Sequence, residues 1–509
     1  MSIAKTYSAQ LSGLQAHIIN IEVDLSNGLH AFVIIGLGDK AVEESKDRIS
    51  AAIKNTGFTS PKQKNQKVVI SLAPADIRKE GPSFDLGMAL AYLSASGDID
   101  FDPENKIFLG ELSLEGEIRK ISGILPLVNG AKKFGFKEIF MPEGNAEEAA
   151  LISGVKIYPI KTLDQVIAHL TQRKDSKIPI QKKTKIKLIN EKFETNFNLI
   201  QGQETAKRAL EIAAAGGHNI AMYGPPGTGK TMLAKALQTI LPPLNEEEIL
   251  EVTSIHSIAK ILDKSFITKP PFRSPHHTSS YASIVGGGSF PRPGEITLAH
   301  RGVLFLDEFP EFDKKVIESL RQPLEEHSIT ISRVRGSINY PAKCILVASM
   351  NPCPCGYGKG NKCKCTDYDI SNYNKRISGP IVDRIDIWVS VSKIEYDKLS
   401  NKSSNNEDSK DILNRVIKAR KIQELRFVKN KIFNKKYNSE ISIANIEKMI
   451  CLSDKVRKML KDFSEKLELS ARAYHKVIKL AQTIADLDNS KEITESHLLE
   501  ALQYRKREY

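Results

Sequence analysis

The sequence predicts an α/β protein whose central domain is built on a parallel sheet, with a mixed α+β domain before it and a helical domain after it. Three observations carry this prediction. A G-x-x-x-x-G-K-[ST] segment at residues 224–231 stands between an apolar run and a helix-forming run. A second apolar run, at residues 303–306, ends in two adjacent acidic residues. Residues before about 170 alternate strand and helix patterns, whereas those after about 393 are rich in helix formers and lysine.

The composition is that of an ordinary globular protein. The 509 residues allow roughly three domains at about 150 residues each. No run approaches the roughly 18 uninterrupted apolar residues of a membrane helix, and the first thirty residues lack the pattern of a secretory signal, so we expect a cytoplasmic protein without a membrane partner. The net charge of +13 favours a polyanionic partner only mildly, because lysines on solvated helix faces explain it equally well.

Shifts in composition place the domain boundaries. We expect an N-terminal domain at 1–170, a basic linker at 171–195, a central domain at 196–392 and a helical domain at 393–509. Within the first domain, residues 31–35 and 67–71 have strand patterns and residues 84–94 a helical one. The polar segment 399–410 marks the last boundary.

The segment at 224–231 predicts a phosphate-binding loop, because it follows a strand pattern at 220–223 and precedes a helix pattern at 232–240. Its glycines let backbone N–H groups converge on phosphates, Lys230 supplies a positive charge to the β and γ oxygens, and Thr231 is a ligand for Mg²⁺. The predicted nucleotide-contacting residues are Gly224, Pro225, Pro226, Gly227, Thr228, Gly229, Lys230, Thr231 and Met232.

The acidic pair that ends the second apolar run completes the predicted site. Four apolar residues followed by Asp307 and Glu308 indicate a buried strand that delivers carboxylates to the edge where α/β sheets bind ligands. We expect Asp307 to hold Mg²⁺ and Glu308 to polarise the water that attacks the γ-phosphate.

Three further residues resemble the sensor and finger positions of AAA+ ATPases. A third strand pattern, at 344–349, leads to Asn351, which resembles sensor 1. Arg384 is our candidate arginine finger, with Arg376 as the reserve, and either role implies an oligomer; the alternative for each is a surface ion pair. Arg472, in the first turn of a helix capped by Ser470, resembles sensor 2.

Several other motifs surround these strands: FRSPHHTSS at 272–280, three glycines at 286–288, PGE at 293–295, FLDE at 305–308 and NPCPCG at 351–356. Together they resemble the Mg-chelatase-like AAA+ family, and within it the YifB or ComM competence-protein type. The resemblance covers nearly the whole chain and implies ATP and Mg²⁺ as cofactors. Chelatase motor subunits share the core but lack this N-terminal domain, which makes chelatase activity the weaker interpretation.

The N-terminal domain resembles the Lon-type protease domain at residues 81–86, 110–112 and 121–125. Ser83 falls on the nucleophile position of that family, but Leu125 occupies the position of the general-base lysine. Because a serine without a base is a poor nucleophile, we expect a Lon-like fold without proteolysis, unless Lys120 or Lys132 takes the place of the base.

Four cysteines form a C-x-C, seven-residue, C-x-C pattern: Cys353, Cys355, Cys363 and Cys365. Their spacing predicts four thiolate ligands of a structural Zn²⁺, with a redox switch or free thiols as alternatives. His276 and His277 are adjacent, and on a strand their side chains point apart. We therefore expect them to pack or to contact DNA and not to bind metal.

Residues 329–341 contain two alternating runs about Arg335 and Gly336, the pattern of a β-hairpin. In related replicative helicases a hairpin at this position projects into the central pore, so Arg333 and Arg335 are candidate contacts to DNA phosphates; solvated arginines on an ordinary hairpin are the alternative.

The resemblance to ComM-type helicases implies a ring-forming, hexameric ATPase that translocates on single-stranded or branched DNA, with branch migration in recombination or transformation as its task. The alternatives are a chelatase-like motor and a protein-remodelling ATPase, each acting on a protein partner and indifferent to DNA.

Overall fold

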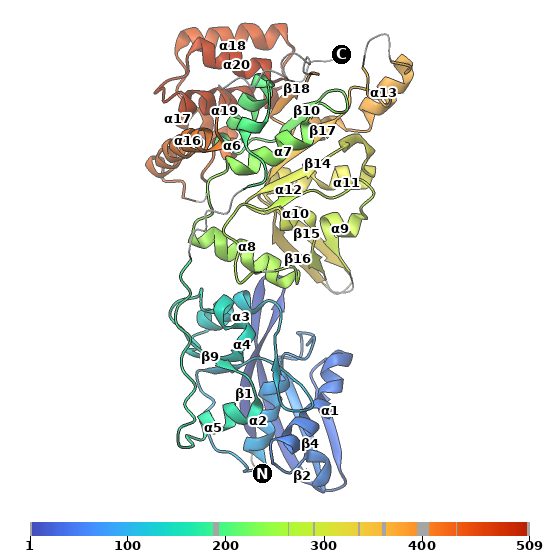
Figure 1. The fold of residues 1–509 in the computed structure, drawn as a ribbon, viewed down its shortest axis with the longest axis vertical. Coiled ribbons are helices and arrows are strands. Elements are labelled where there is room, and N and C mark those ends of the chain that lie inside the picture. The colour runs from blue at the N-terminus through green and yellow to red at the C-terminus, as the bar shows by residue number, and fades with distance from the viewer. Residues whose placement is uncertain are drawn as a thin grey trace. The chain divides into compact units, whose positions relative to one another are not determined.

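The computed structural model describes residues 3–186, 193–262, 264–288, 291–333, 336–358, 363–393, 407–433 and 435–505. The chain divides into two compact units (Figure 1): unit 1 comprises Met1–Lys187 and Glu246–Ile267, and unit 2 comprises Leu188–Asn245 and Thr268–Tyr509. Residues 246–267, which the sequence analysis assigned to the central domain, thus belong to unit 1. Within the described ranges, no helix is long and apolar enough to cross a membrane.

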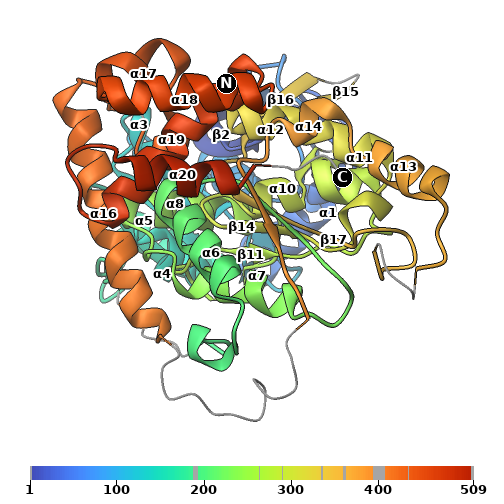
Figure 2. The same cartoon turned by 90° about the horizontal axis from the view of Figure 1, so that it is seen from above.

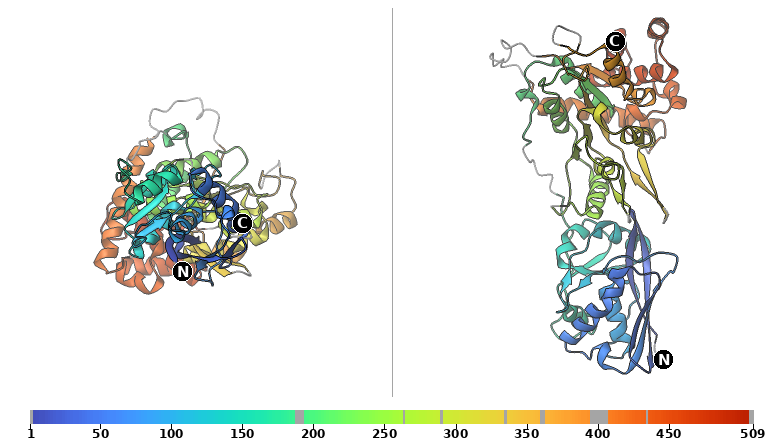
Figure 3. Two further views of the ribbon diagram at one scale, coloured as in Figure 1. Left: turned by 90° about the horizontal axis from the view of Figure 1, so that it is seen from below. Right: turned by 90° about the vertical axis from the view of Figure 1, so that its right-hand side faces the viewer.

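Unit 1 is built on a four-stranded sheet. The order across the sheet is β1 (Ala4–Ser12), β2 (Gln15–Asn27), β4 (Gln66–Ala73) and β3 (Ala31–Ile35), and only β3 and β4 pair in parallel. Helices α2 (Asp85–Ala95) and α3 (Ile124–Lys133) pack against β2 (Figure 3). Alternation in β2 buries Ile19, Ile21 and Val23 completely. The strands predicted at 31–35 and 67–71 are confirmed.

The remaining elements of unit 1 add a small parallel sheet of order β5-β8-β9, a β6–β7 ribbon and further helices. The strands are β5 (Lys106–Phe108), β6 (Glu111–Leu112), β7 (Ile118–Arg119), β8 (Glu138–Pro142) and β9 (Lys156–Ile160). The other helices are α1 (Lys40–Asn55), η1 (Pro61–Gln63), α4 (Glu143–Ala149), α5 (Leu163–Leu170) and α8 (Glu246–Ile258). The helix predicted at 84–94 is confirmed as α2.

The first part of the segment predicted as a linker is anchored on unit 1. Ile178 is buried, Gln181 N donates to Ile157 O at 2.9 Å, and Thr184 N donates to Ala150 O at 3.1 Å. Residues 187–192 of that segment lie outside the described ranges.

Unit 2 is built on a five-stranded, all-parallel sheet. The order is β11 (Phe272–Arg273), β14 (Val303–Leu306), β17 (Ile345–Met350), β10 (Ile220–Tyr223) and β18 (Ile387–Ser390). The three central strands are apolar and almost wholly buried, as expected for a parallel sheet covered on both faces. The strands predicted at 220–223, 303–306 and 344–349 are confirmed, and their carboxyl ends meet at one edge.

Short elements connect these strands. Before β10 lie η2 (Phe197–Leu199) and α6 (Glu204–Gly216), and α7 (Lys230–Thr239) follows it. Between β11 and β14 lie α9 (Tyr281–Val285), β12 (Gly286–Gly287), β13 (Arg292–Pro293) and α10 (Glu295–Leu298). Between β14 and β17 lie η3 (Phe309–Glu311), α11 (Lys314–Ser319), α12 (Arg321–Glu326) and a hairpin of β15 (Ser328–Arg333) and β16 (Gly336–Pro341). The predicted hairpin is confirmed, and its two strands pair with Ile331 opposite Ile338. The elements α13 (Asp367–Lys375) and α14 (Gly379–Val382) precede β18.

The C-terminal part of unit 2 is helical, as predicted, and gathers beside α6, apart from α13 (Figures 1 and 2). Its elements are α16 (Ser409–Lys429), η4 (Asn438–Glu440), α17 (Ile443–Met449), α18 (Asp454–Lys466), α19 (Ala471–Leu487) and α20 (Glu495–Gln503). Helices α16 and α19 both pack on α6, so one continuous apolar core joins these helices to the sheet. The boundary segment predicted at 399–410 lies largely outside the described residues.

Candidate active site

The loop between β10 and α7 has the conformation that its glycines were predicted to supply. Gly224 passes so close to the chain after β18 that a Cβ atom would lie 2.1 Å from Val391 O. Gly229 adopts a left-handed conformation with φ 86° immediately before α7. Thr228 Oγ1 donates to Pro225 O at 3.0 Å and closes the loop. The amino end of α7 is thereby directed at the space above the loop, where an anion is stabilised by backbone N–H groups and the helix dipole.

Lys230 and Asn351 meet at this edge of the sheet. Lys230 Nζ donates to Gly224 O at 2.6 Å, to Pro225 O at 2.9 Å and to Asn351 Oδ1 at 3.2 Å. Burial lowers the pKa of Lys230, whereas Asp307 and Glu308 act to raise it. Met232 lies in α7 and packs against the apolar core.

The two predicted Mg²⁺ ligands also lie together: Thr231 belongs to the first turn of α7, and Asp307 directly follows β14. Thr231 Oγ1 donates to Asp307 Oδ2 at 3.1 Å. One threonine hydroxyl and one carboxylate, both of them hard oxygen ligands, fit the partial protein coordination that Mg²⁺ takes beside a phosphate.

Glu308 follows β14 in a left-handed conformation with φ 51° and ψ 44°. Such a conformation in a residue with a side chain costs about 1–3 kcal/mol and occurs preferentially at functional positions. The carboxylate of Glu308 is half-exposed, and its Oε2 lies 3.1 Å from His277 Nδ1.

The two adjacent histidines do not point apart, so that prediction was wrong. Their rings lie together with centroids 4.2 Å apart, since residues 274–280 form a loop after β11 and not a strand. His277 reaches Glu308 because β11 pairs in parallel with β14, and the segments after these two strands therefore start from the same sheet edge. The sequence did not predict this contact, because a strand of two residues has no recognisable hydrophobic pattern. The usable signal was that His277 follows the apolar residues 271–272 closely in the sequence.

The candidate finger and sensor 2 arginines lie together, because both contact one carboxylate. Arg384 Nη2 is 2.6 Å and Arg472 Nη2 is 3.3 Å from the same atom, Glu325 Oε1 of α12. The side chain of Arg384 is largely buried and also donates to Pro380 O, whereas that of Arg472 is exposed. Arg376 pairs with Glu311 instead.

A buried polar cluster joins α19 to the segments before β10 and β18. Asp386 Oδ2 lies 3.1 Å from His218 Nδ1 and Asp386 Oδ1 lies 2.7 Å from Lys476 Nζ, while His218 Nε2 lies 2.9 Å from Thr483 Oγ1. Burial acts to raise the pKa of Asp386. Lys476 and His218 outweigh this effect and hold the pKa of Asp386 well below its usual range. This cluster connects the helix that carries Arg472 to the segment that carries Arg384.

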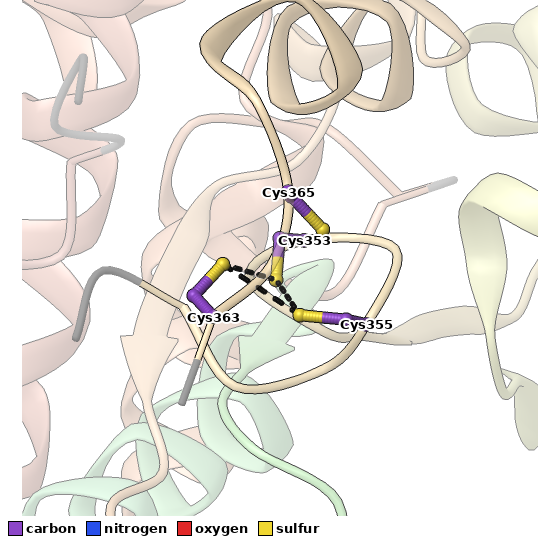
Figure 4. Close-up of side chains that lie close together, drawn as sticks. All are labelled: Cys353, Cys355, Cys363 and Cys365. Carbon is purple, nitrogen blue, oxygen red and sulfur yellow. Dashed lines mark hydrogen bonds between the residues drawn. The ribbon is translucent and has the colours of Figure 1, made fainter. Parts of the chain in front are cut away.

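The four cysteines converge after β17 (Figure 4). All four sulfur atoms lie within 4.8 Å of one another, and three pairs are separated by 3.3, 3.6 and 3.7 Å. Tetrahedral Zn–S bonds of about 2.3 Å require sulfur atoms about 3.8 Å apart, so the donor set fits Zn²⁺. Hydrogen bonds from the backbone of Tyr357 and Lys364 lower the pKa of Cys355 to about 6. At Cys363 and Cys365 backbone hydrogen bonds also act to lower the pKa, but burial and the neighbouring thiols raise it.

The candidate DNA contacts are only partly described. Arg333 ends β15, opposite Gly336, but its side chain and the whole of Arg335 lie outside the described part of the chain.

In unit 1, Ser83 lies half-buried just before α2, and Leu125 is a core residue of α3. Lys120 and Lys132 are exposed, and within the described residues neither these lysines nor any other has a hydrogen bond to Ser83 Oγ. The buried Lys79 instead donates to Pro74 O.

Comparisons with known proteins agree with this architecture. The family model described as "Magnesium chelatase, subunit ChlI" matches residues 196–399, that of "Subunit ChlI of Mg-chelatase" residues 21–145 and that of the "subunit ChlI C-terminal" residues 406–505. Competence protein ComM of Haemophilus influenzae is 40% identical over 99% of this chain and 98% of its own length. The YifB protein of Escherichia coli is 38% identical over 99% of this chain and 97% of its own.

The N-terminal resemblance is also supported. The archaeal Lon protease of Methanocaldococcus jannaschii is 28% identical over 152 residues, which are 30% of this chain and 22% of that protein. The parallel sheet, the phosphate-binding loop and these matches define an AAA+ ATPase motor of the Mg-chelatase type, with a Lon-like N-terminal domain and a helical C-terminal domain. Within this class, the chain belongs to the ComM/YifB family. Membership implies ATP and Mg²⁺ as the ligands of the site.

Proposed function

We propose that this protein is a ring-forming ATPase that converts ATP hydrolysis into movement along DNA. The observation that carries the proposal is the convergence of Lys230, Thr231, Asp307, Glu308 and Asn351 at one edge of the parallel sheet. Lys230 and the backbone of the loop bind the phosphates. Thr231 and Asp307 would hold Mg²⁺, which would neutralise negative charge on the phosphate oxygens. Glu308 accepts the proton of the attacking water, and Asn351 contacts the γ-phosphate.

The positions of Arg384 and Arg472 support a role at the site of a neighbouring subunit. Both guanidinium groups gather on Glu325, and neither bonds to the loop of its own chain in the described residues. In the assembled ring, the phosphates of a nucleotide on an adjacent subunit would replace Glu325 as the anion that these arginines contact. Hydrolysis would then require assembly, and we propose that the ring is a hexamer.

DNA is the proposed substrate for three reasons. Arg333 ends β15, and the sequence has a second arginine, Arg335, before β16, which suits contacts to phosphates without a base code. The chain carries a net charge of +13. The relative in Haemophilus influenzae is named a competence protein, which favours strand separation or branch migration on incoming DNA.

Two accessory features complete the proposal. Zn²⁺ bound by Cys353, Cys355, Cys363 and Cys365 stabilises the loop after sensor 1, which is too polar to fold by burial. The Lon-like domain has no proteolytic activity, because the apolar Leu125 fills the place of the base and Ser83 has no lysine partner in the described residues.

The experiment is ATPase turnover without DNA and with single-stranded, duplex and forked DNA across a salt series. We expect stimulation by DNA that fades as salt rises, because phosphate contacts release counterions. The Arg333→Ala/Arg335→Ala variant should lose the stimulation and keep the DNA-free rate. Turnover indifferent to every DNA, together with stimulation by a protein partner, would instead support a chelatase-like or protein-remodelling motor.

A further inference from the structure

The loop that carries the four cysteines touches the phosphate-binding loop. Gly356 has a left-handed conformation with φ 85°, and a Cβ atom on it would lie 3.0 Å from Pro226 Cδ and 4.0 Å from Asn351 Nδ2. The shorter of these distances is tighter than ordinary van der Waals contact, so a side chain at position 356 would force one of the two loops to shift. Glycine is therefore required here by the backbone conformation and by the close approach to Pro226.

Hydrogen bonds to the first cysteine set the path of this turn. Gly356 N donates to Cys353 O at 2.9 Å, and Gly358 N donates to Cys353 Sγ at 3.2 Å. Cys353 is completely buried, and its sulfur lies within 4.8 Å of the other three (Figure 4). Metal ligands are commonly oriented by such outer hydrogen bonds. A metal ion on the sulfur atoms would therefore fix the turn that contains Gly356.

The same loop surrounds Asn351. A Cβ atom on Gly358 would lie 3.2 Å from Pro352 Cγ, so the loop folds back onto the residue that follows Asn351. Helix α13 begins shortly after the last cysteine, and the hydroxyl of its buried Tyr373 accepts a hydrogen bond from the backbone N–H of Asn351. Asn351 in turn contacts Lys230. The cysteine loop thus meets the proposed nucleotide site at a second place.

The loop has little apolar packing of its own. Of the four cysteines only Cys353 is buried, and Tyr357 is 49% exposed. The entropy lost when a segment adopts one conformation has to be offset by burial or by a cross-link. A metal ion bound by four side chains supplies such a cross-link.

We propose that the metal-bound cysteine loop positions the phosphate-binding loop, so that occupancy of the four-cysteine site sets the affinity for ATP. The inference rests on the proposed function, because it takes residues 224–231 as the nucleotide site and the cysteines as ligands of Zn²⁺, but it does not depend on DNA. Gly356 is a positioning residue, which acts through Pro226. When Zn²⁺ is lost, Pro226 loses its support and the backbone N–H groups that converge on the phosphates lose their alignment.

The test measures the dissociation constant Kd of a fluorescent ATP analogue with Mg²⁺ and without DNA. The full chain is compared with its zinc, after a chelator has removed the zinc and has itself been dialysed away, and after Zn²⁺ is added back. We expect removal to raise Kd about tenfold, a change of about 1.4 kcal/mol, and readdition to restore it. Elemental analysis and circular dichroism of the same samples report the zinc content and the fold. A folded, zinc-free protein with an unchanged Kd would overturn the proposal.

A variant separates the contact from the metal. Gly356→Ala keeps all four cysteines, so its zinc content should equal that of the wild type, whereas the added methyl group presses on Pro226 and should raise Kd by a similar factor. Gly135→Ala is the matched control, because Gly135 has a similar φ of 91° and no atom lies within 4 Å of a Cβ atom built on it. Its Kd should equal that of the wild type. Gly356→Ala protein that binds the analogue as tightly as the wild type would overturn the role of the contact.

A second variant asks whether Pro226 transmits the effect of the metal. Pro226→Ala lacks the ring that Gly356 contacts, so removal of zinc should raise its Kd less than that of the wild type, because both changes break the same contact. An equal rise in the two proteins would overturn transmission through Pro226. Failure of the proposed function has different signatures, which are a purified protein that contains no zinc or a Kd that Lys230→Ala does not change.

Discussion

Lys230 Nζ donates a hydrogen bond to Asn351 Oδ1 at 3.2 Å, and this bond joins the phosphate-binding loop to the strand next to it. The two residues lie 121 positions apart in the chain, and they meet because β10 and β17 are parallel neighbours in the sheet. The two side chains therefore lie together at the sheet edge where we propose that the nucleotide binds.

This arrangement predicts different defects for two variants. Lys230→Ala removes the charge that binds the phosphates, so nucleotide affinity and turnover should both be lost. Asn351→Ala leaves the loop intact and should bind a fluorescent ATP analogue normally, while kcat falls about 10²-fold, the usual loss for one donor to a developing charge. Equal losses of affinity in the two variants would contradict the role of Asn351 in the chemical step.

The shared contact of Arg384 and Arg472 with Glu325 predicts complementation between subunits. Lys230→Ala and Arg384→Ala should each be inactive alone. When the two are mixed and allowed to assemble, some interfaces combine an intact loop from one subunit with an intact arginine from the other, and partial ATPase activity should return. Mixing that restores nothing, although mixed rings form by mass measurement, would show that Arg384 does not act at the neighbour's site.

The Asp386 cluster predicts an acid-dependent loss of stability. Because Lys476 and His218 keep the pKa of Asp386 below its unfolded value, which is about 3.9, the cluster stabilises the fold above that pH. The stabilisation is lost as pH falls through the folded pKa. Asp386→Asn should lower the free energy of unfolding by about 3 kcal/mol at neutral pH, since it leaves Lys476 without its counter-charge.

Urea unfolding of both proteins between pH 3 and pH 7 measures this effect. The difference in free energy of unfolding between wild type and Asp386→Asn should become smaller as the pH falls below about 4. If this difference in free energy does not change with pH, the charge of Asp386 does not stabilise the contact between α19 and the sheet.

The sulfur cluster predicts one Zn²⁺ per chain in protein purified without added metal. Removal of the metal by a strong chelator should lower the melting temperature, and readdition should restore it. Cys363→Ser should weaken retention of the metal, with Cys451→Ser, an exposed cysteine remote from the cluster in sequence, as the control. Metal-free protein whose four thiols all react freely in the native state would favour the redox or free-thiol alternatives.

The strands that carry the site could be predicted because their apolar runs are long enough to read, as residues 303–306 with Asp307 and Glu308 show. Contacts made by short elements, or between segments far apart in the sequence, could not be predicted. His277 follows a two-residue strand, and the pairing of Arg384 with Arg472 through Glu325 depends on three segments brought together only by folding.

Helix α8 illustrates the same limit for the domain organisation. Ser257, at its end, donates to Glu148 Oε1 at 2.6 Å and accepts from Gly123 N at 3.0 Å, and these bonds place residues 246–258 in unit 1. Nothing local to that stretch distinguishes it from a helix of the central domain, because its apolar pattern states only that one face is buried.

The central claim is movement along DNA driven by ATP, and the most direct measurement is release of a labelled strand from a forked duplex. We predict release by the wild type with ATP and Mg²⁺, but none with ADP, with Glu308→Gln, or with Arg333→Ala/Arg335→Ala. Wild-type protein that hydrolyses ATP and binds the fork, yet releases no strand from forked or four-way substrates of any polarity, would contradict the account.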